Sequence, residues 1–421
     1  MKSSQKKNIL VGQSGGPTAV INASLYGVIA EGLKHPEEIG TVYGMINGIE
    51  GFLHDAYMNL SDELTKEDLE LLKQTPAAYL GSCRYKLPED LSSHCYSLIF
   101  HKLEQLNIGY FLYIGGNDSM DTVSKLSRCG KGLKSPIRFI GIPKTIDNDL
   151  IGTDHTPGYG SAAKYVASTV REMVLDASVY HQKAVTIIEL MGRHAGWITA
   201  ASVLARKEAG DNPLLIYLPE SNFDLEQFAC DVKAALDRQS SVVVCVSEGI
   251  SDKNGTFICE YDNAAQTDSF GHKMLTGSGK VLESFIRSRF GVKVRSVELN
   301  ISQRCSGMVL SRTDMEESAA AGAFGVQEAL AGATGQMVAL ERDSIAPYHI
   351  RFQMKDVVQI CNQEKKFPLE WITNHGRDIS PEYASYALPL ISGEVPRRME
   401  NGLPVYLYRK KEVSADAGNK A

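Results

Sequence analysis

The sequence predicts an α/β fold in which parallel strands are covered by helices on both faces. Short apolar runs alternate with helix-length segments from the start of the chain, a pattern typical of βαβ units. Several of these runs end in Gly, Pro or Glu. The length of 421 residues is sufficient for two or three domains. The content of 43% hydrophobic and 22% charged residues is close to the average of globular proteins.

Eight apolar runs are expected to form strands. They cover residues 7–11, 110–114, 138–142, 184–190, 214–218, 242–247, 294–299 and 337–340. In an open parallel sheet, ligands bind beyond the carboxyl ends of the strands. The polar residues directly after these runs are therefore the candidates for a functional site.

The first expected strand is followed by the segment QSGGPTAVINASL, which passes from a glycine turn into an apolar helix. Pro17 suits the first position of that helix. Amide groups at a helix start favour phosphate, so Gly15 and Gly16 are candidates for contact with a phosphate group. A tight turn without a ligand explains the two glycines equally well. The segment lacks the closing Gly-Lys-Ser/Thr of a P-loop and the three spaced glycines of dinucleotide enzymes.

The second expected strand ends in the segment IGGNDS, where two glycines are followed by Asn117 and Asp118. Glycine turns after strands commonly bind phosphates, because the backbone can approach the anion closely. The carboxylate of Asp118 would repel a phosphate at this position. Taken alone, the segment leaves the kind of ligand open.

The third expected strand ends at the segment PKTIDND, which combines an ammonium group with two carboxylates. Asp147 is a candidate general base for a hydroxyl group, because it is a carboxylate close to a cation. Lys144 is a candidate for holding a migrating phosphoryl group, and Thr145 for hydrogen bonding to one of its oxygens. The alternative is a surface turn that Asn148 and Asp149 merely form.

Two later strands also end at polar residues. The segment IIELMGRHAGW places Met191, Arg193 and His194 at a corner between a strand and a helix. Arg193 suits phosphoryl oxygens, because its guanidinium group can donate two parallel hydrogen bonds. His194 is interpreted as a structural donor, and Met191 belongs either to the core or to the edge of a cleft. Glu248 follows the strand at 242–247, where its carboxylate either holds a sugar hydroxyl or caps a helix.

The composition disfavours several kinds of partner. The net charge of -6 and the absence of a basic cluster argue against nucleic acid. The eight cysteines are scattered without Cys-x-x-Cys pairs, which favours a reducing compartment. No apolar run reaches the length of a membrane span, and the start of the chain lacks the apolar core of a signal peptide. We expect a cytoplasmic enzyme that binds neither nucleic acid nor membrane.

Seven segments, taken together and in order, resemble those of the phosphofructokinase family. They are QSGG, LGSCRYK, GGNDS, PKTIDND, MGRHAG, SEGI and ISQR, and they span most of the chain. The resemblance implies two Rossmann-like three-layer lobes with mostly parallel sheets, which face each other across a cleft. The donor lobe would take residues 1–158 and about 303–355, and the fructose 6-phosphate lobe residues 159–302 and about 356–421. The implied reaction is phosphorylation of the 1-hydroxyl of fructose 6-phosphate.

At two positions the chain departs from the ATP-dependent members and resembles the pyrophosphate-dependent branch. Asp118 and Lys144 stand where the ATP pattern has glycine. The Asp118 carboxylate would fill the space of the nucleotide's α-phosphate and repel its charge. Pyrophosphate has no such group, and Lys144 adds a cation beside the phosphoryl group that is transferred. The resemblance therefore implies pyrophosphate as the donor, in a reaction that runs in both directions.

The resemblance also implies a role for each residue that matches a family motif. Asp147 would be the base that takes the proton from the sugar hydroxyl. Thr145 and Arg193 would steady the transferred phosphoryl group, and Asp149 would orient the metal or its loop. The family's magnesium ligand in the glycine corner is an aspartate, and here it is Asn117. An amide oxygen can still bind Mg²⁺, but without a formal charge.

The remaining matches concern the substrates and the assembly. Contacts to the substrates are implied for Gly15, Gly16, Arg84, Met191, Gly192, Glu248 and Arg304. Arg295 matches an arginine that a neighbouring subunit offers, so we expect a homodimer or homotetramer. A second arginine of this kind is replaced by Ala184, with Lys183 beside it as a weak substitute.

Two other functions stay open on the same fold. The first is an ATP-dependent 6-phosphofructokinase, which Asp118 and Lys144 argue against. The second is a regulatory subunit without catalysis, against which the intact Lys144, Asp147 and Arg193 speak. The sequence also leaves open whether a longer sugar, such as sedoheptulose 7-phosphate, is accepted.

Overall fold

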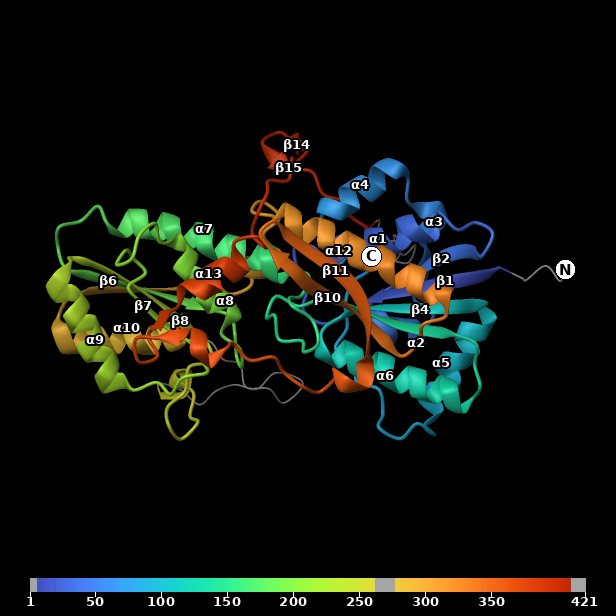
Figure 1. Ribbon diagram of the computed structural model, residues 1–421, viewed down its shortest axis with the longest axis horizontal. Helices are drawn as coiled ribbons and strands as arrows, with labels where there is room; N and C mark the ends of the chain where they lie inside the picture. Colours follow the sequence, from blue (N-terminus) through green and yellow to red (C-terminus); the bar gives the residue numbers. More distant parts are fainter. Residues whose placement is uncertain (1–5, 262–276, 410–421) are drawn as a thin grey trace, which may run out of the picture.

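The computed structural model describes residues 6–261 and 277–409, and the predicted α/β fold is confirmed. Two sheets of mostly parallel strands lie side by side along the long axis of the molecule, each between layers of helices (Figure 1). All eight predicted strands are present. Within the described residues, no helix is long and apolar enough to cross a membrane.

The larger sheet has seven strands, of which the five central ones are parallel. In spatial order it comprises β11 (Tyr348–Asp356), β10 (Gln336–Ile345), β5 (Arg138–Pro143), β4 (Ile108–Gly115), β1 (Lys7–Gln13), β2 (Ile39–Met45) and β3 (Tyr57–Asn59). The two edge strands, β11 and β3, run antiparallel to their neighbours. Because β1, β4 and β5 are adjacent and parallel, their carboxyl ends meet at one edge of the sheet.

Helices bury the apolar side chains on both faces of this sheet. On one face α1 and α12 pack over Ile9, and on the other α5 and α6 pack over Phe111. The bounds of these helices are α1 (Ile21–Gly32), α5 (His94–Gln105), α6 (Asn117–Gly132) and α12 (Arg312–Ala331). A Cβ atom at Gly27 would lie 1.9 Å from the carbonyl oxygen of Ala319, so glycine is required where α1 and α12 approach.

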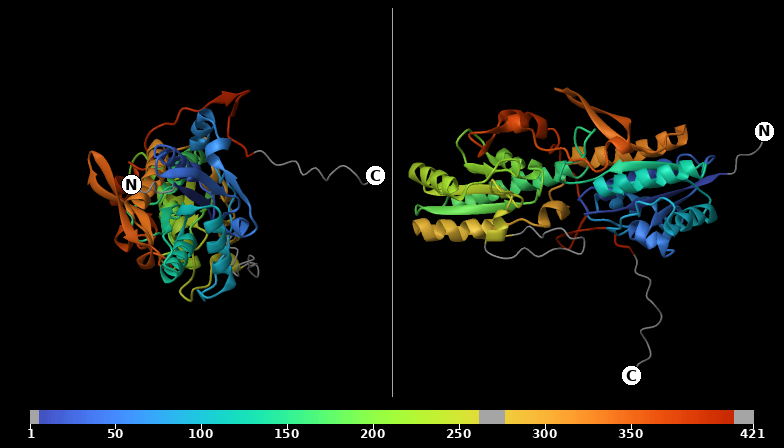
Figure 2. Two further views of the ribbon diagram at one scale, coloured as in Figure 1. Left: turned by 90° about the vertical axis from the view of Figure 1, so that its right-hand side faces the viewer. Right: turned by 90° about the horizontal axis from the view of Figure 1, so that it is seen from below.

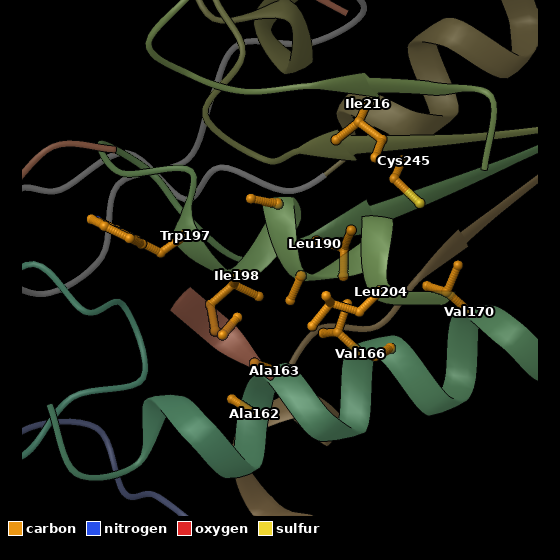
Figure 3. Packing of buried hydrophobic residues seen from close by; sticks show 14 of the residues in the cluster. Ala162, Ala163, Val166, Val170, Leu190, Trp197, Ile198, Leu204, Ile216 and Cys245 are labelled. Carbon is orange, nitrogen blue, oxygen red and sulfur yellow. The ribbon is translucent and has the colours of Figure 1, made fainter. Parts of the chain in front are cut away.

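The smaller sheet has four strands, all parallel. In spatial order these are β7 (Leu215–Tyr217), β8 (Ser241–Ser247), β6 (Ala184–Leu190) and β9 (Lys293–Glu298). Its helices are α7 (Tyr159–Ala177), α9 (Leu225–Arg238) and α10 (Ser278–Phe290). Ala162, Val166 and Val170 of α7 pack with Leu190 and Cys245 on one face (Figure 3). Helices α9 and α10 cover the other face.

The chain passes between the two sheets more than once, as Figure 2 shows. After β9 it returns to the seven-stranded sheet through α11 (Ser302–Cys305) and α12, and after β11 it runs back to α13 (Pro381–Ala387) beside α7. Near its described end, the N–H of Leu407 donates to Oγ1 of Thr75 at 2.9 Å, on the side of the larger sheet. The limits of the two lobes stay a prediction.

Three strands of the larger sheet were not predicted. Strand β2 reads IGTVYGM, where two glycines interrupt the apolar run, although it pairs directly with β1. Strand β3 has only three residues, and β11 is a half-exposed edge strand with several charged residues. The other elements are α2 (Gly48–Leu53), α3 (Leu60–Glu63), α4 (Lys66–Gln74), α8 (Trp197–Ala200), η1 (Ala201–Ala205), η2 (Ile258–Tyr261), η3 (Val357–Gln359), η4 (Leu369–Trp371), β12 (Ile372–Thr373), β13 (Asp378–Ile379), β14 (Met399–Glu400) and β15 (Leu403–Pro404).

Candidate active site

The carboxyl ends of β1, β4 and β5 border a cavity of about 250 Å³. This cavity continues into one of about 840 Å³, which also reaches Arg193, His194 and Glu248 beside the smaller sheet. Asp118 and Asp147 line both cavities. Side chains of both lobes therefore face one continuous space.

Most of the residues expected at a site gather around this space. Those that line one or both cavities are Gly15, Gly16, Arg84, Asn117, Asp118, Lys144, Thr145, Asp147, Asp149, Met191, Arg193, Glu248 and Arg304. Gly192 and Arg295 do not line them. Arg295 is exposed on β9, an edge strand of the smaller sheet. Lys183 lies 3.4 Å from Oδ1 of Asp237 in its own lobe.

The corner after β1 is a tight turn that also packs against an arginine. Gly15 has a φ of 74°, which favours glycine. Its N–H donates to the carbonyl oxygen of Cys83 at 3.1 Å. A Cβ atom at Gly16 would lie 2.9 Å from a guanidinium nitrogen of Arg304. The two glycines thus permit a tight turn and bring the backbone to the wall of the smaller cavity.

The prediction that Pro17 begins the following helix is wrong. Helix α1 begins at Ile21. The intervening residues are held differently, because the carbonyl oxygen of Thr18 accepts a hydrogen bond from the N–H of Ala77 at 3.1 Å. This long-range bond fixes a loop where the local sequence favoured a first helical turn.

The corner after β4 passes directly into α6. A Cβ atom at Gly115 would lie 1.8 Å from Oγ of Ser119, so this turn requires glycine. Asp118 lies in the first turn of α6, where the helix dipole favours a carboxylate. Its side chain is 71% exposed, and its Oδ1 lies 3.4 Å from Nζ of Lys86.

The loop after β5 is largely buried, and this excludes the alternative of a surface turn. Lys144 is only 3% exposed, and its Nζ donates to the carbonyl oxygen of Gly16 at 2.6 Å. Asn148 is fully buried. Oγ1 of Thr145 accepts a hydrogen bond from the N–H of Asp147 at 3.1 Å. The loop is therefore held by its own contacts at the edge of the cavity.

Burial changes the ionisation of three side chains in this loop. It lowers the pKa of Lys144 to about 8, although the charges of Asp147 and Asp149 oppose this effect. Burial raises the pKa of Asp147, and the Lys144 ammonium opposes this rise. Burial and the charge of Asp147 together raise the pKa of Asp149. A carboxylate with a raised pKa is a better proton acceptor near neutral pH.

The corner after β6 is held by the half-buried carboxylate of Glu248. Gly192 has a φ of 135°, and its N–H donates to Oε1 of Glu248 at 3.3 Å. The helix-capping alternative for Glu248 is wrong, because the next helix, η2, begins only at Ile258. Burial raises the pKa of Glu248 to about 7. Met191 combines both predicted places, since it packs against the core and lines both cavities.

The two predicted metal ligands, Asn117 and Asp149, differ in how their side chains are held. Oδ1 of Asn117 accepts the N–H of Asn362 at 2.6 Å, and its Nδ2 donates to the carbonyl oxygen of Gln363 at 2.5 Å. Asp149 lines the smaller and the larger cavity beside Asp147. Within residues 6–261 and 277–409, no group of three or more His, Cys, Asp or Glu could hold a metal. Asp149 is placed to bind a Mg²⁺ ion that arrives with phosphate ligands, whereas both polar atoms of Asn117 are engaged by the backbone of residues 362 and 363; both metal assignments stay predictions.

Some side chains that line the cavities were not predicted. Lys86 lies two residues after Arg84 in the segment LGSCRYK, so its motif could have indicated it. The others include Asn362, Glu364 and Lys366, which line the larger cavity outside every recognised segment. Nζ of Lys366 donates to the carbonyl oxygen of His194 at 2.7 Å. The backbone of His194 is therefore an acceptor within this wall.

Comparison with known proteins gives consistent matches over nearly the whole chain. The family model described as Phosphofructokinase matches residues 8–300. A protein of Methylococcus capsulatus named pyrophosphate–fructose 6-phosphate 1-phosphotransferase is 39% identical over 404 residues, which cover 95% of each chain. A protein of the same name from Xanthomonas campestris is 40% identical and covers 97% of each chain. The crystal structure of a pyrophosphate-dependent phosphofructokinase from Marinobacter aquaeolei is 36% identical, with a TM-score of 0.86 over 97% of this chain and 98% of that one.

Proposed function

Because the chain belongs to the phosphofructokinase family, we propose that it transfers a phosphoryl group from pyrophosphate to the 1-hydroxyl of fructose 6-phosphate. The products are fructose 1,6-bisphosphate and phosphate, and the reaction serves glycolysis and gluconeogenesis in both directions. The observation that carries the proposal is the presence of Asp118 and buried Lys144 in one small cavity. This pair suits a short, highly charged donor without a nucleoside.

The smaller cavity offers a binding site for pyrophosphate. Lys144, Arg84 and Arg304 supply positive charge along its walls, and the backbone of Gly15 and Gly16 closes one end. Guanidinium groups can donate paired hydrogen bonds to phosphate oxygens. Binding of this anion would also favour the charged form of Lys144 over the neutral form that burial favours.

Asp147 is the proposed base for the sugar hydroxyl. It lines both cavities, so a hydroxyl in the larger cavity and a phosphoryl group in the smaller one can meet beside it. Burial raises its pKa, which improves its power to accept a proton. Lys144, Thr145 and Arg193 would stabilise the negative charge of the phosphoryl group during transfer.

The larger cavity is the proposed site of fructose 6-phosphate. Met191, Arg193, Glu248 and Arg304 line it. Glu248 would accept hydrogen bonds from sugar hydroxyls, and Gly192 fixes the position of Glu248 through its N–H. Arg295 would contact the 6-phosphate of the fructose 6-phosphate that is bound to a neighbouring subunit. Its exposure on an edge strand permits this contact.

A divalent metal ion belongs to this proposal as a companion of pyrophosphate. Mg²⁺ would be held by Asp149 and by oxygens of the donor, and it would neutralise charge on the phosphates. Mg²⁺ commonly keeps several waters and is bound through one or two carboxylates and substrate phosphates. Asp149 is the only protein side chain that this proposal assigns to the metal, which agrees with that mode of binding.

Initial rates of the purified chain with each donor test the proposal. We expect formation of fructose 1,6-bisphosphate with pyrophosphate and Mg²⁺, and little or none with ATP. Equal or faster use of ATP would instead support the ATP-dependent alternative. Absence of activity with either donor in a folded chain would support the regulatory-subunit alternative. The expected homodimer or homotetramer and the cytoplasmic location stay predictions.

A further inference from the structure

Residues 362–367, read as NQEKKF, cross from one lobe to the other along the wall of the larger cavity. We call this segment the strap. It follows β11 and η3 of the larger sheet and leads to η4 beside the smaller one (Figure 1). Its hydrogen bonds to other parts of the chain include contacts at three places, which are the start of α6, the loop after β5 and the corner after β6.

The first end of the strap is fastened by Asn117 at the start of α6. The N–H of Asn362 donates to Oδ1 of Asn117 at 2.6 Å, and Nδ2 of Asn117 donates to the carbonyl oxygen of Gln363 at 2.5 Å. Nδ2 of Asn362 lies 3.4 Å from Oδ1 of Asp121, one turn further along α6. One side chain thus makes a two-point contact with the backbone of the strap.

The middle of the strap is fastened to the loop that carries Asp147. The N–H of Lys365 donates to the carbonyl oxygen of Asp149 at 2.7 Å. Its Nζ donates to the carbonyl oxygen of Asp154 at 2.7 Å and lies 5.0 Å from the ring centroid of Trp197. Burial lowers the pKa of Lys365 to about 8. The strap is therefore joined to this loop by a backbone hydrogen bond and by the ammonium group of Lys365.

The last residues of the strap are fastened to the corner after β6, beside the proposed site of fructose 6-phosphate. Nζ of Lys366 donates to the carbonyl oxygen of His194 at 2.7 Å. The N–H of Phe367 donates to Oε1 of Glu220 at 3.0 Å, and the same oxygen accepts the N–H of Gly196 at 2.9 Å. Phe367 is buried in the apolar cluster that includes Trp197.

We propose that the strap holds three parts of the site in fixed relative positions: the corner after β4, the loop of Asp147 and the corner after β6. In this proposal Asn117 fastens the strap as its latch and is not a magnesium ligand. The two-point contact needs one acceptor and one donor on the same side chain, and an amide supplies both. An aspartate would keep the acceptor for Asn362 but would place an oxygen against the carbonyl oxygen of Gln363. This accounts for an asparagine at a position where the family pattern has a carboxylate. Asn117 is a positioning residue, and its effect on turnover rests on the proposed function.

Hydrogen exchange of the free chain tests the latch in Asn117→Asp, which replaces the amide NH2 by an oxygen and preserves the shape of the side chain. Three strap amides donate hydrogen bonds in the native chain, those of Asn362, Lys365 and Phe367. We expect exchange in peptides covering residues 360–368 to become about threefold to tenfold faster, as the loss of one such bond predicts. Gln363→Ala is the matched control, because it leaves the carbonyl oxygen that Asn117 contacts, and its exchange should match the native chain.

Kinetics of the same variants test the second part of the proposal. We expect kcat of Asn117→Asp to fall about tenfold with each KM changed less than twofold, and the Mg²⁺ concentration for half-maximal rate to stay unchanged. Native exchange rates in Asn117→Asp would overturn the latch. A several-fold lower Mg²⁺ requirement would overturn the claim that Asn117 does not bind the metal. If circular dichroism shows that Asn117→Asp is unfolded, Asn117→Ala replaces it, because alanine loses both hydrogen bonds without adding a charge. A native chain without transferase activity would refute the proposed function, whereas the exchange result would still decide on the latch.

Discussion

Replacing Asp118 is expected to let ATP act as a phosphoryl donor, and its surroundings limit the size of the effect. The side chain is 71% exposed and lies 3.4 Å from Nζ of Lys86. Two like charges about 4 Å apart repel each other by about 1 kcal/mol in water and by about 4 kcal/mol near a protein surface. Exposure and the neighbouring cation place Asp118 near the lower value. We therefore expect removal of the charge to raise kcat/KM for ATP about fivefold.

Two substitutions at this position separate charge from volume. Asp118→Asn removes the charge and keeps the volume, whereas Asp118→Gly removes both. If the side chain also fills the space of the α-phosphate, the glycine variant should use ATP clearly better than the asparagine variant. Glycine near the start of α6 and the loss of a favourable dipole interaction should each reduce the free energy of unfolding by about 0.3 to 1 kcal/mol. Urea denaturation of both variants measures that cost.

The companion substitution Lys144→Gly should impair the use of pyrophosphate. Loss of one charge-assisted contact to the transferred group costs about 1.5 to 3 kcal/mol, which is about one to two decades in rate. The assay is the initial rate with each donor in the native chain, Asp118→Gly, Lys144→Gly and the double variant. The donor-gate interpretation of Asp118 is wrong if the native chain already uses ATP as well as pyrophosphate. It is also wrong if the folded double variant gains no use of ATP.

Three further predictions concern the base, the assembly and the acceptor corner. Asp147→Asn should lower kcat by about two to four orders of magnitude with KM little changed, and near-native turnover would contradict its role as base. Mixing Arg295→Ala with Asp147→Asn chains should restore part of the activity through hybrid sites, provided that mixed oligomers form by native mass spectrometry; no recovery in such oligomers would count against Arg295 acting between subunits. Burial raises the pKa of Glu248 from 4.5 to about 7, so the native state keeps a proton that the unfolded chain loses, and the free energy of unfolding falls as pH rises through that window. Glu248→Gln removes this ionisation, so urea denaturation at pH 5 and pH 8 should show a smaller fall than in the native chain, and an equal fall would show that Glu248 does not titrate in this window.

The parts of the fold that the sequence predicts are those whose environment is uniform. Strands such as β1 and β8 are buried on both faces, so they read as continuous apolar runs. Strand β2 lies next to the edge strand β3 and carries glycine at position 44, where a Cβ atom would lie 2.6 Å from Leu80. That requirement for glycine comes from a side chain 36 residues away, so no local pattern in β2 reveals it.

The gathering of Gly15, Asp118 and Lys144 around the smaller cavity follows from the topology of the larger sheet. They come just after β1, β4 and β5, which are adjacent and parallel, so the carboxyl ends of these strands meet at one edge. The failed prediction at Pro17 has the opposite origin. Local preference favours a helix there, but the hydrogen bond between Thr18 and Ala77 holds a loop. Strand order therefore predicts which residues meet, whereas the conformation of the turns depends on distant partners.

The strap shows why a residue at a motif position need not act as the motif implies. Its sequence, NQEKKF, reads as a polar surface loop, and nearly every contact that fastens it involves a backbone atom on at least one side. Backbone groups are the same in every residue, so the strap carries no signal that points to its partners. Asn117 and Asn362 are 245 residues apart, and only the folded chain brings them to 2.6 Å. Once they meet, an amide at position 117 satisfies a donor and an acceptor together, which a carboxylate cannot do. The difference between asparagine and aspartate in this corner is then a difference in hydrogen bonding to the strap before it is a difference in metal affinity.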